Sequence, residues 1–292
     1  MNTKRKIRWA WLLPLVILIL FGGYFLFTLG RPAPVPMKQE LYEGVTYRRI
    51  IRYLPHTMIA HVIVIDRKAG RIDFVTTPPD HLEDGAVTAR TTSEFLEDFE
   101  LQIAINGDGF FPWWSRGPAD YYPQAGDPVT PNGFSAFRGD IYADGLQSEK
   151  PEPTLYISRR NELTFNRRPG NIFHAISGDR MLILGGEIVA DLDDSAIHPR
   201  TAIGVNRNGR YVYLVVVDGR QPFYSQGASF QELAELLKDL GAHFAMALDG
   251  GGSSTLVMAG ENGEAVVLNS PIDSYIPGRE RPVANHFGVQ IR

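Results

Sequence analysis

The sequence predicts an α+β fold: a strand-rich mixed sheet with few helices, preceded by one N-terminal transmembrane helix. Short runs rich in β-branched residues recur along the chain, whereas only two segments combine helix start signals with amphipathic spacing. An uncharged apolar segment covers 9–30. With 292 residues, 44% hydrophobic and 21% charged, the chain has the composition and length of a globular protein with a sizeable core.

The apolar segment 9–30 is long enough to cross the hydrocarbon core of a membrane as a helix. Residues 1–8 contain Lys4, Arg5, Lys6 and Arg8, and such clusters stay cytoplasmic. We therefore expect a single-pass signal anchor in the cell membrane with the rest of the chain extracytoplasmic. A cleaved signal peptide is the alternative, but its apolar region would be shorter. Residues 31–40 predict a Pro-rich linker and residues 41–292 one domain.

Charge and cysteine content exclude several function classes. The formal net charge of −4 leaves no basic stripe, so we expect no nucleic-acid partner. The chain has no cysteine, which excludes disulfides, thiol nucleophiles and Cys-based zinc sites. An anionic ligand must therefore be held by local groups.

Strands are predicted wherever alternating or β-branched-rich runs occur. They cover 46–53, 61–66, 71–76, 101–105, 181–184, 202–206, 211–217, 244–248, 255–258, 265–268 and 286–291. Gly-containing turn sequences at 66–71, 206–210 and 259–264 predict hairpins. Helices are predicted at 91–99 and 229–241, where Thr91 with Glu94 and Ser229 with Glu232 have capping-box spacing.

Polar residues stand at the ends of three predicted strands. One strand ends at Asp218, the helix at 229–241 follows, and a second strand ends at Asp249. If these strands are parallel in one sheet, they form a β-α-β unit and both carboxylates emerge at the same edge. Asn106 ends a third strand. The carboxyl ends of strands are where open α/β sheets usually bind ligands.

The glycine run Gly250–Gly252, followed by Ser253 and Ser254, has three interpretations. It is a turn, an anion cradle of backbone N–H groups, or part of a catalytic loop. A nucleotide P-loop is excluded because no lysine follows the glycines.

Three arginines are candidate anion ligands, because a guanidinium fork matches the oxygens of phosphate or carboxylate. They are Arg200, which precedes Thr201, Arg220 in the sequence Asp218-Gly219-Arg220, and Arg281. The alternative for each is a solvated ion pair at a turn.

The residues also allow two other chemistries, a serine hydrolase and a metal-dependent phosphodiesterase. A serine hydrolase with Ser253 or Ser254 and His286 is disfavoured because no G-x-S-x-G elbow is present. A metal phosphodiesterase using Asp218 and Asp249 stays open, since carboxylates suit hard cations. The aromatic stretch 110–122 predicts a loop whose rings either stack over a sugar ligand or pack beneath the loop.

Five motifs in a fixed order carry a family resemblance: AING followed by GFF, then PRTAIGV, VVVDGR, ALDGGGSSTLV and ERPVANHFGV. With these motifs the chain resembles the phosphodiester glycosidase family over most of the domain. One departure is NGDGFF, where the family pattern NG-x-FF has one residue fewer. This extra residue affects where the Asn106 side chain points and what role Asp108 has.

The resemblance implies an extracytoplasmic hydrolase that cleaves sugar-1-phosphodiester bonds in phosphorylated glycans or glycolipids. It implies catalytic roles for Asp218, Asp249 and Asn106. It implies substrate-binding roles for Arg200, Thr201, Gly219, Arg220, Gly250, Gly251, Gly252, Ser253, Ser254, Arg281 and Asn285. No cofactor is expected, although a divalent metal stays open. A non-catalytic module that binds phosphorylated cell-surface glycans is the competing class, beside the metal-dependent phosphodiesterase.

Overall fold

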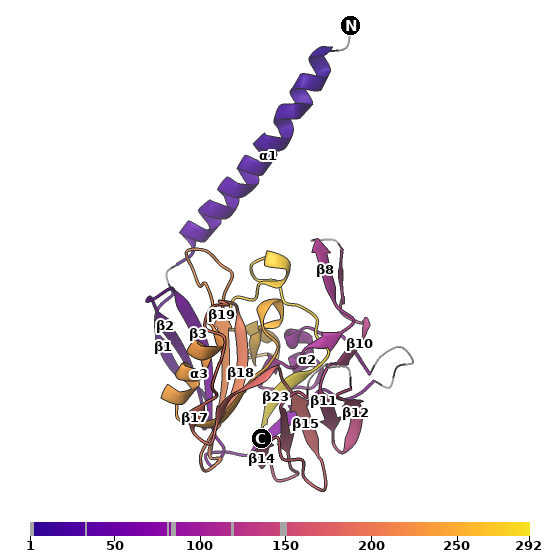
Figure 1. Cartoon of the computed structure of the whole chain (residues 1–292), viewed down its shortest axis with the longest axis vertical. Coiled ribbons are helices and arrows are strands. Elements are labelled where there is room, and N and C mark those ends of the chain that lie inside the picture. Colours follow the sequence, from indigo (N-terminus) through magenta and orange to yellow (C-terminus); the bar gives the residue numbers. More distant parts are fainter. Residues whose placement is uncertain (1–2, 33, 81, 83–85, 118–119, 147–150) are drawn as a thin grey trace.

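The computed structural model describes the backbone of residues 3–292 except 33, 81, 83–85, 118–119 and 147–150, and the side chains of those residues from 12 onward except 28–29. Its helices are α1 (Thr3–Gly30), α2 (Thr92–Asp98) and α3 (Phe230–Asp239), with short 3₁₀ turns η1 (Gly251–Ser253) and η2 (Asp273–Tyr275). Strands dominate the rest (Figure 1). The predicted α+β class with few helices is confirmed.

The first sheet has eight strands in the order β1-β2-β3-β19-β18-β20-β16-β17. They are β1 (Met37–Tyr42), β2 (Val45–Arg52), β3 (Met58–Asp66), β19 (Tyr211–Asp218), β18 (Arg200–Asn206), β20 (Ala242–Ala247), β16 (Arg180–Leu184) and β17 (Glu187–Ile188). Every neighbouring pair is antiparallel. The ladders of this sheet are therefore all antiparallel and not mixed as predicted, because the same-direction strands β19 and β20 are separated by β18.

Two five-stranded sheets complete the framework, and both are antiparallel throughout. The second sheet has the order β22 (Ala265–Val267), β21 (Leu256–Ala259), β6 (Ile103–Asn106), β23 (His286–Ile291) and β4 (Ile72–Thr76). The third sheet has the order β12 (Asp140–Asp144), β11 (Phe134–Phe137), β15 (His174–Ser177), β13 (Thr154–Ile157) and β14 (Leu163–Phe165). Smaller pairings join β5 (Val87–Thr88), β10 (Pro128–Pro131) and β7 (Phe110–Phe111), and β8 (Trp114–Gly117) with β9 (Asp120–Tyr122).

The core lies on both faces of the first sheet, because alternate residues of a strand point to opposite sides. On β19, Leu214 and Val216 pack toward the second sheet with Phe287, whereas Val215 packs with Leu233 of α3. On its other side the second sheet is covered by α2. The layers are therefore α3, first sheet, second sheet and α2.

Both domain helices begin where the sequence predicts. Thr91 and Glu94 form a complete capping box at α2, and Ser229 and Glu232 form one at α3. Gly241 follows α3 with a φ of +95°, a left-handed conformation that favours glycine at a helix end. These local hydrogen bonds explain why the two helices are readable from sequence.

Two of the three predicted hairpins are confirmed, at 206–210 between β18 and β19 and at 259–264 between β21 and β22. The hairpin predicted at 66–71 is wrong, because this turn carries the chain from β3 of the first sheet to β4 of the second. The predicted β-α-β unit is confirmed in strand direction, but its two strands are not neighbours. β19 and β20 run the same way with β18 between them, so both end at the same edge.

The N-terminal helix α1 projects away from the sheets (Figure 1). Its described apolar side chains are largely exposed, including Leu13 and Leu18. Within the described part of the chain, no helix is both long and apolar enough to cross a membrane, so the predicted span stays a prediction. β1 begins at Met37 and so extends into the segment 31–40 that was predicted to be linker.

Candidate active site

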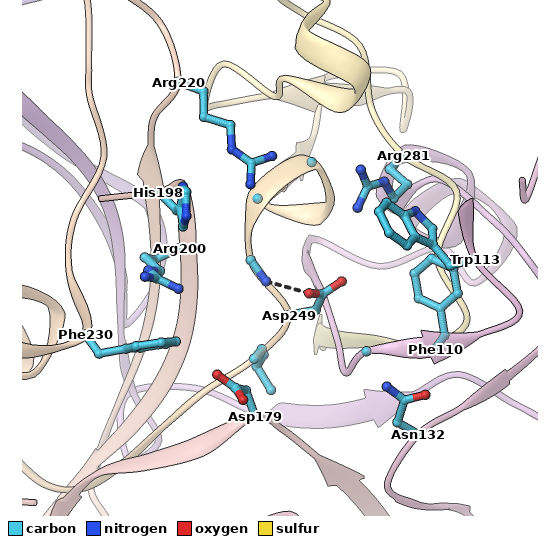
Figure 2. Close-up of a pocket in the computed structure, with 15 residues that line it drawn as sticks. Phe110, Trp113, Asn132, Asp179, His198, Arg200, Arg220, Phe230, Asp249 and Arg281 are labelled. Carbon is cyan, nitrogen blue, oxygen red and sulfur yellow. Dashed lines mark hydrogen bonds between the residues drawn. The ribbon is translucent and has the colours of Figure 1, made fainter. Parts of the chain in front are cut away.

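A polar pocket lies where β20 ends and the glycine run begins (Figure 2). Its volume is about 400 Å³. The residues that line it are Gly109, Phe110, Trp113, Asn132, Asp179, His198, Arg200, Arg220, Phe230, Leu248, Asp249, Gly250, Gly251, Gly252 and Arg281. We call it the Asp249 pocket. It brings together one of the two predicted catalytic aspartates, the three predicted arginines and the three glycines.

Asp249 is held in a fixed orientation at the pocket wall. Its Oδ1 accepts a hydrogen bond from the Gly250 amide at 2.8 Å, and its Oδ2 accepts one from Ser253 Oγ at 2.6 Å. Burial raises the pKa of Asp249, while the Ser253 hydrogen bond and the nearby Arg281 charge oppose that rise. The result is an ordered carboxyl with two acceptor bonds that faces a cationic cavity.

The glycine run allows two arginines to approach the backbone closely. A Cβ on Gly251 would lie 3.0 Å from Arg220 Nη2, and one on Gly252 would lie 2.7 Å from Arg281 Cζ. Gly251 also has a φ of +64°, which side chains rarely adopt. The amides of Gly250 and Gly251 donate to Asp249 and Pro199, so these two are not the phosphate cradle that the sequence allowed.

Hydrogen bonds and aromatic contacts hold the guanidinium groups of Arg281 and Arg200 in place at the pocket wall. Arg281 Nε donates to Asp273 Oδ1 at 2.7 Å and its guanidinium lies over the Trp113 ring. Arg200 donates to two backbone carbonyls and lies 3.7 Å from the centre of the Phe230 ring. Burial lowers the pKa of Arg200 to about 10, so this group remains a cation at neutral pH.

Arg220 has an unusual backbone conformation. Its φ is +57°, a left-handed conformation that is uncommon for non-glycine residues and gathers at functional sites. The preceding Gly219 is buried, and a Cβ there would lie 2.5 Å from Pro199 N. Arg220 Nε and His198 Nδ1 are buried without a hydrogen-bond partner in the described residues. Burial and the charges of Arg220 and Arg200 lower the pKa of His198.

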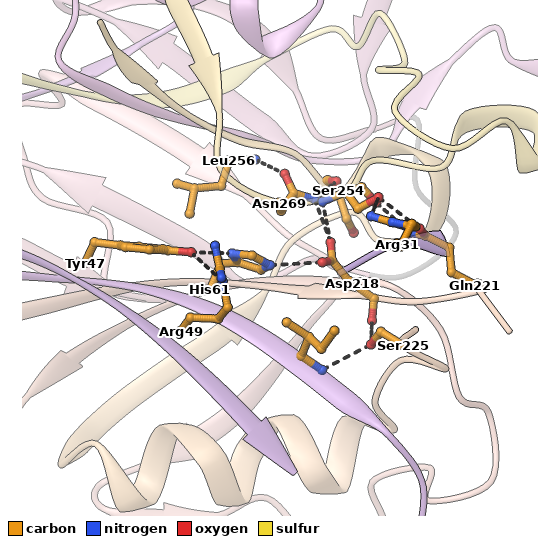
Figure 3. Close-up of polar contacts among 12 residues, drawn as sticks. Arg31, Tyr47, Arg49, His61, Asp218, Gln221, Ser225, Ser254, Leu256 and Asn269 are labelled. Carbon is orange, nitrogen blue, oxygen red and sulfur yellow. Dashed lines mark hydrogen bonds and ion pairs between the residues drawn. The ribbon is translucent and has the colours of Figure 1, made fainter. Parts of the chain in front are cut away.

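Asp218, the other predicted catalytic aspartate, does not line the Asp249 pocket. It is 1% exposed. Its Oδ2 lies 2.9 Å from His61 Nε2, and its Oδ1 accepts hydrogen bonds from the Ser270 amide and Asn269 Nδ2 (Figure 3). His61 in turn pairs with the Tyr47 hydroxyl at 2.8 Å. Asp218 thus lies in a saturated buried network beneath the turn that carries Arg220.

Arg31, which directly follows α1, reaches this same turn. Its Nη1 donates to Gln221 Oε1 at 2.6 Å, and its Nη2 donates to Ser270 Oγ at 3.1 Å. Its guanidinium lies 3.7 Å from the centre of the Tyr224 ring. The N-terminal segment is therefore tied to the residue next to Arg220.

Asn106 and Thr201 support the site from below. Asn106 Nδ2 donates to the Asp249 carbonyl at 2.8 Å, and its Oδ1 accepts from Thr201 Oγ1 and the Thr255 amide. Both side chains are fully buried. They fix the backbone of Asp249 and do not line the pocket, so a direct catalytic contact of Asn106 is not seen in this geometry.

Asn285 and the additional residue Asp108 belong to the same support. Asn285 Oδ1 accepts from the Asp108 amide at 2.7 Å. The Asp108 carboxyl accepts from the amides of Gly109 and Gly133, and burial together with the neighbouring Glu152 raises its pKa well above the usual range. Asp108 therefore shapes the loop that brings Gly109 to the pocket.

The two serines of the motif have different positions. Ser253 contacts Asp249, whereas Ser254 Oγ is buried without a partner in the described residues. His286, weighed as a base for them, contacts Thr77 and stacks on Phe95. Burial lowers the pKa of His286 to about 3. His286 does not line the pocket, and this agrees with the sequence argument against a serine hydrolase.

Several pocket residues were missed by sequence reasoning, namely Gly109, Asn132, Asp179, His198, Phe230 and Leu248. Asp179 follows β15 in an ordinary turn sequence, so nothing local distinguished it. The stretch 110–122, predicted to be a loop, contains β7, β8 and β9. It supplies Phe110 and Trp113 to the pocket (Figure 2), and the sequence had indicated such rings as one of two alternatives.

Over the part of the chain that the structure describes, no group of three or more His, Cys, Asp or Glu side chains is placed to hold a metal ion. The pocket holds three guanidinium groups and two carboxylates, Asp179 and Asp249. Such a set suits an anionic ligand that carries a reactive centre near Asp249.

Comparisons with known proteins give the family and the fold. The phosphodiester glycosidase family model matches residues 99–290. A hypothetical protein from Synechocystis has a similar structure, with a TM-score of 0.61 and 16% identity over 89% of this chain and 64% of that one, so this chain spans less than two thirds of its length. The catalytic domain of zebrafish N-acetylglucosamine-1-phosphodiester alpha-N-acetylglucosaminidase, auto-inhibited by its pro-peptide, has a TM-score of 0.57 and 19% identity over 89% of this chain and 85% of that one.

Both structural likenesses support the fold. No curated protein matches the chain significantly. The family model covers two thirds of the sequence, including Asn106, Arg200, Arg220, Asp249 and Arg281. The chain belongs to the phosphodiester glycosidase family.

Proposed function

We propose that this protein hydrolyses the bond between the anomeric carbon of a sugar and the oxygen of a phosphodiester, in phosphorylated glycans or glycolipids. The observation that carries the proposal is one ordered carboxylate, Asp249, in a pocket with three guanidinium groups. Membership of the family supports hydrolysis of phosphodiester glycosides.

The arginines would bind the phosphodiester. Arg200, Arg220 and Arg281 enter the pocket from different segments (Figure 2), and guanidinium forks match phosphate oxygens. They concentrate positive charge in a chain whose formal net charge is −4. The rings of Trp113 and Phe230 offer apolar surface on which a sugar ring can pack.

Asp249 would act at the anomeric carbon as nucleophile or base. In the overall step the bond from that carbon to the phosphate oxygen breaks. Water supplies the oxygen and one proton of the new sugar hydroxyl, and its second proton passes through the carboxylate to the phosphomonoester or to solvent. The electron pair leaves with the phosphate oxygen, which the arginines stabilise and which needs less protonation than a sugar alkoxide. Asp179 is the second pocket carboxylate, available for the two-carboxylate scheme that glycosidases generally use.

Hydrolysis in ¹⁸O-labelled water tests this bond assignment. The full-length protein is incubated with a panel of sugar-1-phosphodiesters, and the released sugar and phosphomonoester are analysed by mass spectrometry. We expect the label in the sugar, because the carbon–oxygen bond breaks. Label in the phosphate would overturn the assignment and favour the phosphodiesterase alternative.

The same reactions with and without chelator test for a metal. We propose a mechanism that needs none, so activity should persist in chelator. Loss of activity that returns with a divalent cation would contradict this. Binding of every panel member without turnover would instead support the non-catalytic glycan-binding module.

The location is a separate proposal: attachment to the cell membrane through residues 9–30 with the domain extracytoplasmic. The exposed apolar side chains of α1 and the basic residues within 1–8 support it. Protease added to intact cells should digest the domain, and alkaline carbonate should leave the protein in the membrane fraction. A domain protected in intact cells would contradict the orientation.

A further inference from the structure

A second hollow lies on the third sheet, outside the Asp249 pocket. Its volume is about 760 Å³, and it shares no lining residue with that pocket. Its lining includes Arg159, Arg160, Glu162, Arg168 and Phe173. We call it the arginine groove. The turn between β13 and β14 supplies one wall, and the segment that leads into β15 supplies another.

The groove is strongly cationic. Arg159, Arg160 and Arg168 are exposed, and within the described residues none of them forms an ion pair with a carboxylate. Glu162 is the acidic lining residue, and its charge also acts on Arg67 outside the groove. Three guanidinium groups therefore face solvent together in a chain of net negative charge.

Aromatic rings hold two of these guanidinium groups in place. Arg159 lies 5.3 Å from the centre of the Phe173 ring, and Arg168 lies 5.0 Å from that of Phe134. A guanidinium over a ring keeps its N–H edge available for an anion and loses less freedom on binding. Burial lowers the pKa of the adjacent His174 to about 4, so at neutral pH the cations are the arginines alone.

One strand links the groove to the Asp249 pocket. Phe173 lines the groove, β15 covers His174–Ser177, and Asp179 lines the pocket. Phe173 and Asp179 are six positions apart, so the chain between them spans at most roughly 20 Å. A polymer of several sugar units can therefore contact both sites, whereas a single sugar phosphodiester can occupy only one.

The position of the groove favours a polymer over a membrane lipid. The third sheet lies toward the end of the domain opposite the point where α1 leaves it (Figure 1). A membrane that contacts α1 would then face the other end of the molecule. The ligand that fits is a chain with repeated negative charges, since three cations in one groove can bind several phosphates of the same chain.

We infer that the arginine groove is a second binding site for a polyanionic glycan, which retains a distal part of the phosphodiester-linked substrate while another part occupies the Asp249 pocket. The identity of the polymer as substrate rests on the proposed function. The binding of polyanions does not, so the two can fail separately.

Polyphosphate binding tests the groove without turnover. The probe is inorganic polyphosphate, with orthophosphate for comparison, measured on the full-length Asp249→Asn chain in mild detergent. We expect polyphosphate to bind far more tightly than orthophosphate. Arg159→Gln, Arg160→Gln and Arg168→Gln together should weaken it by about tenfold or more and reduce its salt dependence. The matched control changes Lys38, Arg207 and Lys238 to Gln, which removes three exposed charges that do not line the groove.

Equal weakening in the control would overturn the inference, because net charge alone would then explain binding. Absence of polyphosphate binding by the unaltered groove would overturn it as well. Preferential binding to anionic over neutral lipid vesicles, lost in the groove variant, would make a lipid headgroup the ligand instead.

Kinetics provide the second measurement. With Asp249 intact, the groove variant should raise KM for a polymeric phosphodiester by about tenfold and leave kcat/KM for a small sugar-1-phosphodiester within about twofold. A parallel loss on both substrates would indicate damage to the pocket and contradict a distal site. If no substrate is hydrolysed but polyphosphate still binds through the groove, the proposed function fails and the groove stands.

Discussion

Asp218 and Asp249 end two strands that run the same way in one sheet, yet their surroundings are opposite. Asp249 lines a pocket with three arginines, whereas Asp218 is 1% exposed and bonded to His61, Asn269 and Ser270. The segment that packs over each carboxylate makes the difference. Gly250–Gly252 have no side chains to cover Asp249, but 269–270 closes over Asp218. Position at a strand end therefore brings a carboxylate to the site edge, and packing decides whether it meets a ligand.

The largest expected effect comes from Asp249→Asn. If Asp249 acts at the anomeric carbon, turnover should fall by about 10³-fold or more. Because burial raises its pKa, the native state binds more protons than the unfolded state between the ordinary and the raised value, and stability falls as pH rises through that window. Removing the charge should leave the midpoint of thermal unfolding at neutral pH unchanged or higher. Turnover assays and thermal melts measure both.

The wild-type pH profile sharpens the same point. Activity should decline as pH falls through the raised pKa of Asp249, above the ordinary aspartate range. A profile that stays flat through and below that ordinary range would contradict a reacting carboxylate with a raised pKa.

Gly252→Ala should have the next largest effect. The new Cβ would displace Arg281, whose Cζ would lie 2.7 Å away, so kcat/KM should fall by about 10²-fold as one anion ligand moves. Gly70→Ala is the control, because a Cβ there meets only the Glu43 carbonyl at 3.5 Å. Equal activity of the two variants would show that the glycine run is not needed for the approach of Arg281.

Asp218→Asn should have the opposite effects to Asp249→Asn, namely a large loss of stability and a small loss of activity. Its amide would place N–H donors against donors of the buried network, and the free energy of unfolding should fall by about 1–3 kcal/mol. Activity of the folded variant should fall by about tenfold at most, through the turn that carries Arg220. Urea unfolding and kcat/KM separate the two readouts. Abolished turnover at unchanged stability would transfer the reacting role to Asp218.

The smallest effect is expected for Arg31→Ala. This change removes hydrogen bonds to Gln221 and Ser270 beside Arg220, so KM should rise about two- to fivefold with little change in kcat. Lys38→Ala, exposed on β1, is the control. If the KM of Arg31→Ala is as low as that of Lys38→Ala, Arg220 does not depend on contacts from the N-terminal segment.

The helices and most strands of the first two sheets were predictable because their signals are local, whereas the third sheet and the short strands β5, β7, β8, β9 and β10 were not predicted. Capping boxes at Thr91 and Ser229, the hairpin turns at 206–210 and 259–264, and β-branched runs all act within a few residues. Arg200, Arg220, Arg281 and Asp249 are likewise predictable as site candidates from the sequence motifs that contain them. Residue type alone indicates an anion ligand.

Three features needed the tertiary structure. The turn at 66–71 joins two sheets because β3 and β4 find partners far along the chain. Asp179 and His198 reach the pocket from segments without a local signal. The roles of Asp218 and Asn106 depend on what covers them.

The sequence by itself determined the strand-rich α+β class, the family, and the residue types of an anion site at one sheet edge. Only the tertiary structure decided that Asp249 lines the pocket while Asp218 is buried beside the neighbouring turn. It also brought the arginines of the groove together with Phe173 and Phe134. The physical reason is that propensity and capping act over a few residues, whereas burial and ionic surroundings arise from chain segments that meet only in the folded state.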